Sequence, residues 1–322
     1  MKIWLESLGY QDYNLTPASA DASFRSYHRL QFDGRSFIVM DAPPEQEPCH
    51  QFIKVAGKLR SVRLSAPEII EQNVEQGFLL LSDFGNTDYL SALNGESEAA
   101  LYADALAALL QMQTRIDNSD LPLYDETLLN REMDLFDDWF LQQLLGIELN
   151  QSQYDRWLSI RQALVANALE QPKVFVHRDY HSRNLMKIEC RNPGILDFQD
   201  AVRGPITYDL VSLLRDCYIN WPVLRVEQLL HDYYDLAVVN ELTDVEYGRF
   251  LRWFNLMGIQ RHLKAIGIFS RLNIRDSKSG YLKDIPRTLD YINQVSAEET
   301  SMLELYSLIT ELSLISRVKS LL

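Results

Sequence analysis

One loop between two short apolar segments constrains this chain more than any other feature of its sequence. Val174–Val176 is β-branched and aromatic, which predicts a buried strand leading into His177 and Asp179. Asn184 follows Asp179 by five residues, and the apolar character of residues 185–188 predicts a second strand that returns from the loop. A carboxylate and an amide are therefore expected close together at the ends of two strands.

A second carboxylate belongs to the same pattern. Ile195 and Leu196 form a further apolar run directly before Asp197. Phosphoryl transfer uses one Asp to accept the proton of the substrate hydroxyl, and an Asn and a second Asp to hold Mg²⁺. Oxygen ligands suit this hard cation, whose charge offsets that of the transferred phosphate. The spacing thus predicts that Asp179 is catalytic and that Asn184 and Asp197 bind the metal.

The two histidines of this stretch permit another interpretation. His177 and His181 are four residues apart, which is the spacing of a zinc-binding pair on a helix. The strand predicted at Val174–Val176 argues against a helix here, and neither histidine belongs to an H-E-x-x-H motif. The sequence therefore favours the magnesium site over a zinc site.

These residues carry a resemblance to a known superfamily. His177-x-Asp179-x4-Asn184, Leu196-Asp-Phe198 and Gly204-Pro-Ile-Thr-Tyr-Asp-Leu210 resemble the aminoglycoside phosphotransferase and choline kinase superfamily, which shares the protein-kinase fold. Residues 21–25, 39–45 and 208–218 further resemble the bacterial anomeric kinases, which act on N-acetylmuramate and N-acetylglucosamine in cell-wall recycling. The resemblance covers nearly the whole chain, although the last forty residues carry little of it.

The resemblance implies an α+β, protein-kinase-like fold of two lobes. A small β-rich N-lobe, residues 1–82, would bind the nucleotide, and a large helical C-lobe, residues 83–322, would carry the catalytic loop and the substrate site. The implied activity is that of an ATP-dependent sugar kinase that uses Mg²⁺ and phosphorylates the anomeric hydroxyl of an amino sugar. His177 and Asp209 are implied to support the catalytic loop without touching substrate.

The nucleotide-binding part departs from the kinase pattern in two ways. Residues 19–23 stand in the place of the glycine-rich loop and contain no glycine, although small side chains can still admit phosphate oxygens to backbone N–H groups. Residues 37–40 are apolar where the third strand should carry a Lys, so Arg25 or Arg29 is the candidate phosphate cation. The alternatives are that residues 19–23 form an ordinary polar turn and that both arginines lie on the surface. The residues assigned to the nucleotide here are Asp21, Ala22, Ser23, Phe24, Arg25 and Arg29.

A second motif lies near the predicted boundary between the lobes. Ser82-Asp-Phe-Gly85 spells the metal motif of kinases, but it precedes the catalytic loop by about a hundred residues and follows an apolar strand. Its place in the chain predicts the hinge between the lobes, where the backbone of Leu80, Leu81 and Ser82 is expected to contact adenine. Without the third-strand Lys, Glu45 and Glu47 are interpreted as first-turn acids of the next helix, favoured by its dipole.

Hydrophobic periodicity predicts the remaining elements. Asp33-Gly34 is a strong signal for the turn of a hairpin between strands 25–32 and 35–41. Further strands are expected at 69–72 and 78–81, and residues 200–205 are expected to form a turn. Helices are predicted over residues 2–9, 47–60, 98–113, 126–145, 151–169, 208–218, 224–239, 243–272 and 298–322.

Of the predicted sites, the substrate site has the weakest support in the sequence. A sugar acid requires hydrogen bonds, an aromatic ring for stacking and a cation for its carboxylate. For each candidate residue, the alternative to substrate binding is a place in the core or on the solvent-exposed surface. The candidates are Arg215, Asp216, Trp221, Arg261 and Lys264.

Composition narrows the possible partners and the compartment. The 322 residues carry a net charge of −14 and contain no basic run, which argues against nucleic acid and anionic membranes as partners and favours a small-molecule sugar. The three cysteines lack metal-ligand spacing and suit a reducing compartment. The first residues lack the apolar core of a secretory signal, and no apolar run is long enough to span a membrane. We expect a cytoplasmic monomer.

Two other classes of function stay open on the sequence. One is a small-molecule kinase for choline, homoserine, an aminoglycoside or another sugar. The other is a nucleotide-binding protein without catalytic activity, which the missing third-strand Lys suggests. A protein kinase is disfavoured because no Ala-Pro-Glu segment follows Asp197.

Overall fold

The computed structural model describes residues 1–19 and 24–321, and the chain divides into two compact units. Unit 1 consists of residues 1–108 and 183–201, and unit 2 consists of residues 109–182 and 202–322. Unit 1 thus contains all of the predicted N-lobe together with the segment of Asn184 and Asp197. The boundary at residues 82 and 83 stays a prediction.

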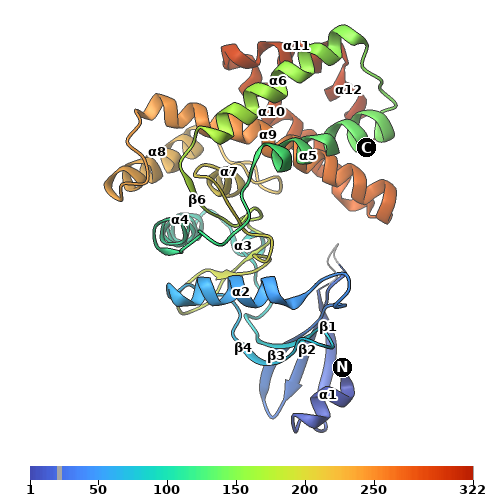
Figure 1. The fold of residues 1–322 in the computed structure, drawn as a ribbon, viewed down its shortest axis with the longest axis vertical. Helices are drawn as coiled ribbons and strands as arrows, with labels where there is room; N and C mark the ends of the chain where they lie inside the picture. Colours follow the sequence, from blue (N-terminus) through green and yellow to red (C-terminus); the bar gives the residue numbers. More distant parts are fainter. Residues whose placement is uncertain (20–23, 322) are drawn as a thin grey trace. The chain divides into compact units, whose positions relative to one another are not determined.

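Unit 1 is built on a five-stranded antiparallel sheet (Figure 1). The strands are β1 (Asn14–Ser19), β2 (Ser26–Phe32), β3 (Arg35–Asp41), β4 (Ile69–Asn73) and β5 (Phe78–Ser82). Their order in the sheet is β1-β2-β3-β5-β4. Asp33 and Gly34, with φ of 48° and 70°, connect β2 to β3 and place Phe32 opposite Arg35. This confirms the predicted hairpin, because a two-residue connection of this kind requires positive φ at both positions.

Two helices contribute side chains to the core of unit 1. Trp4 of α1 (Lys2–Ser7) stacks on Phe78 of β5 at 5.5 Å between ring centroids. Helix α2 (Cys49–Ser61) buries Phe52, Val55 and Leu59. Phe52 also packs against Phe198, with the ring centroids 4.8 Å apart, so α2 shares a core with the segment of Asp197.

The rest of unit 1 holds the segment between the predicted metal ligands. Strands β7 (Leu185–Met186) and β8 (Gly194–Ile195) pair antiparallel, which confirms the returning strand predicted after Asn184, although it is shorter than 185–188. The helices α3 (Tyr89–Ala92) and α4 (Glu98–Arg115) follow β5, and the residues of α4 from Leu109 on belong to unit 2. A Cβ on Gly194 would lie 2.7 Å from the ring of Phe84, so only glycine allows this close contact between β8 and the 82–85 segment.

Unit 2 is helical, with one two-stranded sheet formed by β6 (Lys173–Val176) and β9 (Val202–Pro205). Helix α9 (Tyr247–Asp276) packs against α5, α6, α7 and α10 (Figure 1). It is buried on all sides from Leu256 to Lys264, as expected for a helix in the centre of a bundle. The other elements are α5 (Glu126–Leu135), a π-helix (Phe136–Leu144), α6 (Gln151–Leu169), α7 (Tyr208–Leu214), α8 (Val223–Val239), α10 (Ile285–Glu298), α11 (Leu303–Glu311) and α12 (Leu314–Lys319), with short 3₁₀ turns at Ser279–Asp284 and Thr300–Met302.

Several element predictions for unit 2 were wrong. Residues 202–205 form β9 instead of a turn, because they pair with β6, a strand far back in the chain that ends at Val176. The predicted helix over 298–322 is divided into shorter pieces, since Ser313 adopts φ of 52° and ends the helical path. Helix α7 stops at Leu214, and α10 had not been predicted. Among the residues with assigned positions, no helix combines the length and apolar character that crossing a bilayer demands.

Candidate active site

The catalytic loop of unit 2 begins where β6 ends. Asp209, in the first turn of α7, accepts hydrogen bonds from the backbone N–H groups of His177 at 2.6 Å and Arg178 at 2.9 Å. Arg178 adopts φ of 78°, which is costly for a residue with a side chain. The two bonds hold this conformation, so the contacts of Asp209 are those that a supporting residue beneath the loop would make.

Asp179 lies in a positively charged environment. Its backbone N–H donates to Nδ1 of His177 at 3.3 Å. Burial alone would raise the pKa of the Asp179 carboxyl, but nearby cationic groups outweigh it and bring the pKa below its ordinary value. Asp179 is therefore ionised at neutral pH, as a proton acceptor must be. The groups that lower the pKa, in decreasing order, are Lys264, His181, Arg178 and Arg261.

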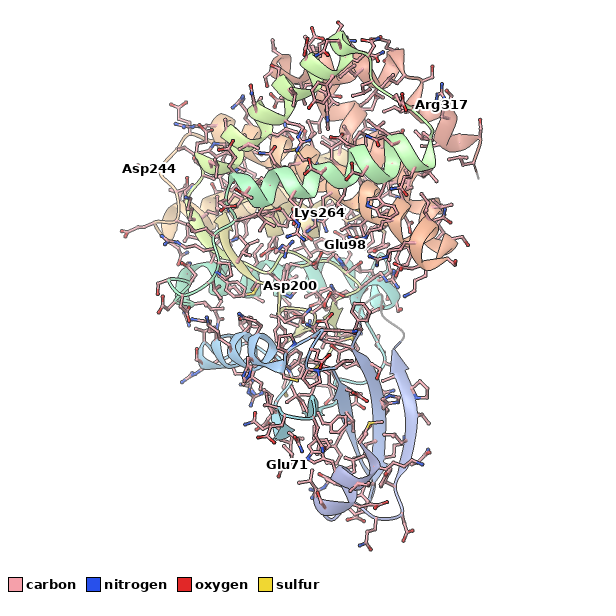
Figure 2. The ribbon with its side chains drawn as sticks, turned by 45° about the vertical axis from the view of Figure 1, so that its right-hand side comes forward. Glu71, Glu98, Asp200, Asp244, Lys264 and Arg317 are labelled. Atoms are coloured by element: carbon pink, nitrogen blue, oxygen red, sulfur yellow. The ribbon has the colours of Figure 1, made fainter. Side chains whose placement is uncertain are left out.

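A buried carboxylate that the sequence analysis missed organises the cations around Asp179. Glu132 of α5 is 4% exposed and forms ion pairs with Lys264 at 3.1 Å and with Arg178. The hydroxyl of Tyr124 donates to the same carboxylate. Lys264 Nζ also donates to the hydroxyl of Tyr208 at 3.0 Å, and Figure 2 shows Lys264 beside α5 in the interior of unit 2. Nothing in the sequence marked Glu132, because an acid on an amphipathic helix is ordinarily exposed.

Unit 1 brings the two predicted metal ligands together. Nδ2 of Asn184 lies 3.4 Å from Oδ2 of Asp197, and the backbone N–H of Leu196 donates to the Asn184 carbonyl at 2.9 Å. Asp197 is exposed with φ of 60°, whereas Phe198 and Gln199 beside it are buried. Gln199 Nε2 donates to Oδ1 of Asp197 at 2.8 Å and orients the carboxylate. This oxygen-rich pair fits Mg²⁺.

The zinc interpretation of the histidine pair fails on local structure. Residues 177–181 form a loop and not a helix, so the two imidazoles are not presented on one helical face. His177 is buried under the loop, and the ring of His181 packs edge-on against Tyr218, at 5.4 Å between centroids.

The residues predicted to bind the nucleotide differ in what the structure shows of them. Asp21, Ala22 and Ser23 lie outside the described residues, and Phe24 is 67% exposed. Arg25 forms an ion pair with Glu47. Glu47 precedes α2, which begins at Cys49 after Pro48, so the interpretation of Glu45 and Glu47 as first-turn acids of the helix was wrong.

Arg29 makes a different set of contacts. Its guanidinium donates to both carboxylate oxygens of Asp83, at 2.6 Å and 3.0 Å, and to the Gly85 carbonyl at 2.9 Å. Burial opposes ionisation of Asp83, but the bonds from Arg29 and Ser36 lower the pKa of this carboxyl. Arg29 thereby ties β2 to the segment after β5, which accounts for its position without a phosphate.

The adenine contact expected at Leu80–Ser82 conflicts with the sheet. Leu80 and Leu81 lie in β5, between β3 and β4, and each is paired on both sides. The backbone N–H of Ser82 donates to the Glu68 carbonyl at 2.9 Å. Backbone groups in a central strand are engaged by its neighbours, which argues against an adenine contact at Leu80 and Leu81.

The predicted substrate residues all lie in unit 2. Arg215 donates to Asn255 at 2.8 Å and stacks over the ring of Phe254. Asp216 accepts from the N–H and the hydroxyl of Ser182, at 3.0 Å and 2.6 Å, which gives it a clear role in holding the catalytic loop. The half-buried Trp221 stays a prediction, whereas Arg261 and Lys264 are both close enough to Asp179 to lower its pKa.

These features define a phosphotransferase of the protein-kinase-like fold, and comparison with known proteins agrees. Residues 14–242 match the family described as the phosphotransferase enzyme family. Because the match covers more than half of the 322 residues, the chain belongs to this family.

Close relatives share most of the chain. An N-acetylmuramate/N-acetylglucosamine kinase of Pseudomonas putida is 47% identical over 93% of this chain and 88% of its own length. A protein of the same name from Neisseria meningitidis is 42% identical over 97% of this chain and 95% of its own length.

Solved structures confirm the predicted fold class. The choline kinase LicA from Streptococcus pneumoniae matches with a TM-score of 0.64 at 12% identity, over 91% of this chain and 97% of its own. The ADP-bound aminoglycoside phosphotransferase APH(2'')-Ib matches with a TM-score of 0.59 at 14% identity, over 90% of this chain and 96% of its own.

Proposed function

We propose that this chain is an ATP-dependent kinase that phosphorylates the anomeric hydroxyl of N-acetylmuramate or N-acetylglucosamine in cell-wall recycling. One observation carries the proposal: relatives 42% to 48% identical, matched over at least 92% of this chain, bear the name of this kinase. The ionised Asp179 in unit 2 and the Asn184–Asp197 pair in unit 1 supply the groups that the reaction requires.

In this reaction Asp179 acts as the proton acceptor. Its carboxylate accepts the proton of the anomeric hydroxyl while the sugar oxygen forms a bond to the γ-phosphorus of ATP. The bond from this phosphorus to the β–γ bridging oxygen breaks, so the products are the sugar 1-phosphate and ADP. An anomeric hydroxyl is more acidic than an ordinary alcohol, so a carboxylate of low pKa suffices for a late and partial proton transfer.

Asn184 and Asp197 are the residues that would hold Mg²⁺. Bound there, the cation supplies positive charge to the phosphate oxygens. Gln199 keeps the Asp197 carboxylate oriented through its 2.8 Å bond to Oδ1. Leu196 fixes Asn184 through the backbone, so both ligands are set by short local contacts within unit 1.

Arg25 is our candidate for the charge that the missing third-strand Lys would supply. Arg29 is less suited, since Asp83 and Gly85 already take up its donors. Arg25 directly precedes β2 and pairs with Glu47, which lies two residues before α2 begins. A cation–carboxylate pair therefore lies beside the starts of this strand and this helix. We infer that Glu47 orients Arg25 toward the phosphates.

Phosphorus NMR of the product tests this function. With N-acetylglucosamine or N-acetylmuramate and Mg²⁺–ATP, the product phosphate should couple to the anomeric proton. The 1-O-methyl glycoside of each sugar should not be turned over, although it should still compete for binding. A 6-phosphate product would reject the anomeric assignment, and turnover of choline or kanamycin in place of both sugars would reject the amino-sugar assignment.

The setting of the enzyme is part of the same proposal. Cys49, Cys190 and Cys217 form no disulfide, as suits a protein of the cytoplasm, where we place the reaction. We expect a monomer of 37.3 kDa, which light scattering checks directly.

A further inference from the structure

The buried middle of α9 contains polar side chains, and each must be compensated inside the protein. Lys264 is compensated by Glu132 at 3.1 Å and by Tyr208 at 3.0 Å. His262 donates through Nε2 to the Arg215 carbonyl at 2.9 Å and is kept neutral, because burial and then Arg261 lower its pKa to about 3.

Arg261 differs from these neighbours. It is 5% exposed, yet its Nη1 reaches only the sulfur of Cys217 at 3.7 Å, and its Nε has no hydrogen-bond partner in residues 1–19 and 24–321. Within the same ranges no carboxylate forms an ion pair with it. Burial of a guanidinium carries a desolvation cost of several kcal/mol. The charges of nearby groups, among them Asp179 and Asp216, outweigh this cost and raise the Arg261 pKa, but neither carboxylate is in ion-pair contact with the guanidinium.

The position of Arg261 relates this cost to the reaction. Its charge lowers the pKa of Asp179, and the charge of Asp179 in turn favours the protonated guanidinium, so the two groups are neighbours in unit 2. Cys217, its sulfur contact, directly precedes Tyr218, whose ring packs against His181 in the catalytic loop. Through Cys217 and Tyr218, Arg261 is thus connected to the loop that carries Asp179.

Resting on the proposed function, we propose that Arg261 binds the carboxylate of an acidic sugar substrate. N-acetylmuramate carries a carboxylate on a lactyl ether, whereas N-acetylglucosamine has a hydroxyl at that position. The planar guanidinium with its fixed donors suits a carboxylate and would regain in the complex the charge-assisted bonds that it lacks. Lys264 is not this group, because Glu132 already neutralises it.

The substrate side is tested first, on the wild-type protein. The KM for N-acetylmuramate is compared with that for its methyl ester, which keeps the shape of the lactyl group and removes its charge. A charge-assisted bond predicts a KM about 10 to 100 times higher for the ester, with kcat changed less. Equal KM values for acid and ester would overturn the proposal.

The protein side is tested with Arg261→Gln, and with Arg252→Gln as control on the exposed face of the same helix. Loss of a charge near Asp179 affects both sugars alike, so the measured quantity is the ratio of kcat/KM for N-acetylmuramate to that for N-acetylglucosamine. We expect this ratio to fall about 10- to 100-fold in Arg261→Gln and to stay at the wild-type value in Arg252→Gln. The ester should then be turned over as well as the acid.

A second substitution covers the case in which Arg261→Gln does not fold. Arg261→Lys keeps the charge but loses the planar set of donors, and it should retain part of the preference for the acid. An unchanged ratio in a folded Arg261 variant would refute the assignment. A wrong proposed function gives a different result from a wrong role for Arg261, because the wild type would then phosphorylate neither sugar. Calorimetric binding of N-acetylmuramate and its ester would then still decide the role of Arg261.

Discussion

Replacing Glu132 with Gln should destabilise unit 2 by about 3 to 5 kcal/mol, the usual cost of removing one partner from a buried ion pair. The side chain of Glu132 is 5% exposed, and those of Lys264 and Arg178 are 8% and 18% exposed. The amide keeps the shape of the carboxylate but removes the negative charge that forms ion pairs with both cations. The donor from Tyr124 is also weakened, since an amide oxygen is a poorer acceptor than a carboxylate.

Urea unfolding followed by tryptophan fluorescence and by far-ultraviolet circular dichroism measures this cost, provided that both probes report the same transition. Glu126→Gln is the matched control, because Glu126 lies exposed in the first turn of the same helix and should cost less than about 1 kcal/mol. A loss below about 1 kcal/mol in Glu132→Gln would show that water or structural relaxation compensates the cations, contrary to our reasoning.

A double variant separates the ion pair from packing. Lys264→Met removes the cation that Glu132→Gln leaves unpaired, so the two changes together should cost less than the sum of the single losses. We expect a coupling of about 1 to 3 kcal/mol, in the range found for contacting residues. Strict additivity would contradict a direct interaction at 3.1 Å.

Four further outcomes follow from the site. Asp179→Asn should keep ATP binding and lower kcat by about 10²- to 10⁴-fold in a coupled ADP-release assay, and near wild-type turnover would disprove the proton-acceptor role. Asp197→Ala should raise the Mg²⁺ concentration needed for half-maximal activity, whereas an unchanged titration would remove it from the metal site. Lys264→Met should raise the pKa of Asp179 and move the acidic limb of the kcat/KM profile to higher pH, because Lys264 is the strongest of the groups that lower this pKa; a fixed limb would argue against this coupling. Arg25→Ala should raise the KM for ATP by an amount worth about 1.5 to 3 kcal/mol, whereas Arg29→Ala should chiefly lower stability, and the reverse result would exchange the two roles.

Local signals in the sequence predicted the elements whose geometry is set by neighbouring residues. The Asp33-Gly34 turn is one example, since the type of turn follows from two residues that tolerate positive φ. Helix α6 is another, because its apolar positions recur at helical spacing; in the structure Asn150 and Gln153 also cap its first turn reciprocally. The same kind of signal fails at β9, whose four residues become a strand only through pairing with β6.

The sequence by itself predicted the residues of the catalytic loop and their roles, because Asn184 follows Asp179 by five residues and an apolar run precedes Asp197. Only the tertiary structure decided which charges near Asp179 are already paired. Lys264 and Arg261 are similar in sequence terms, three residues apart on one helix, but Glu132 on another helix neutralises one of them and not the other. The physical reason is that long-range packing decides whether a buried charge has a counter-charge beside it. No local pattern of residue types encodes which distant side chain will face it.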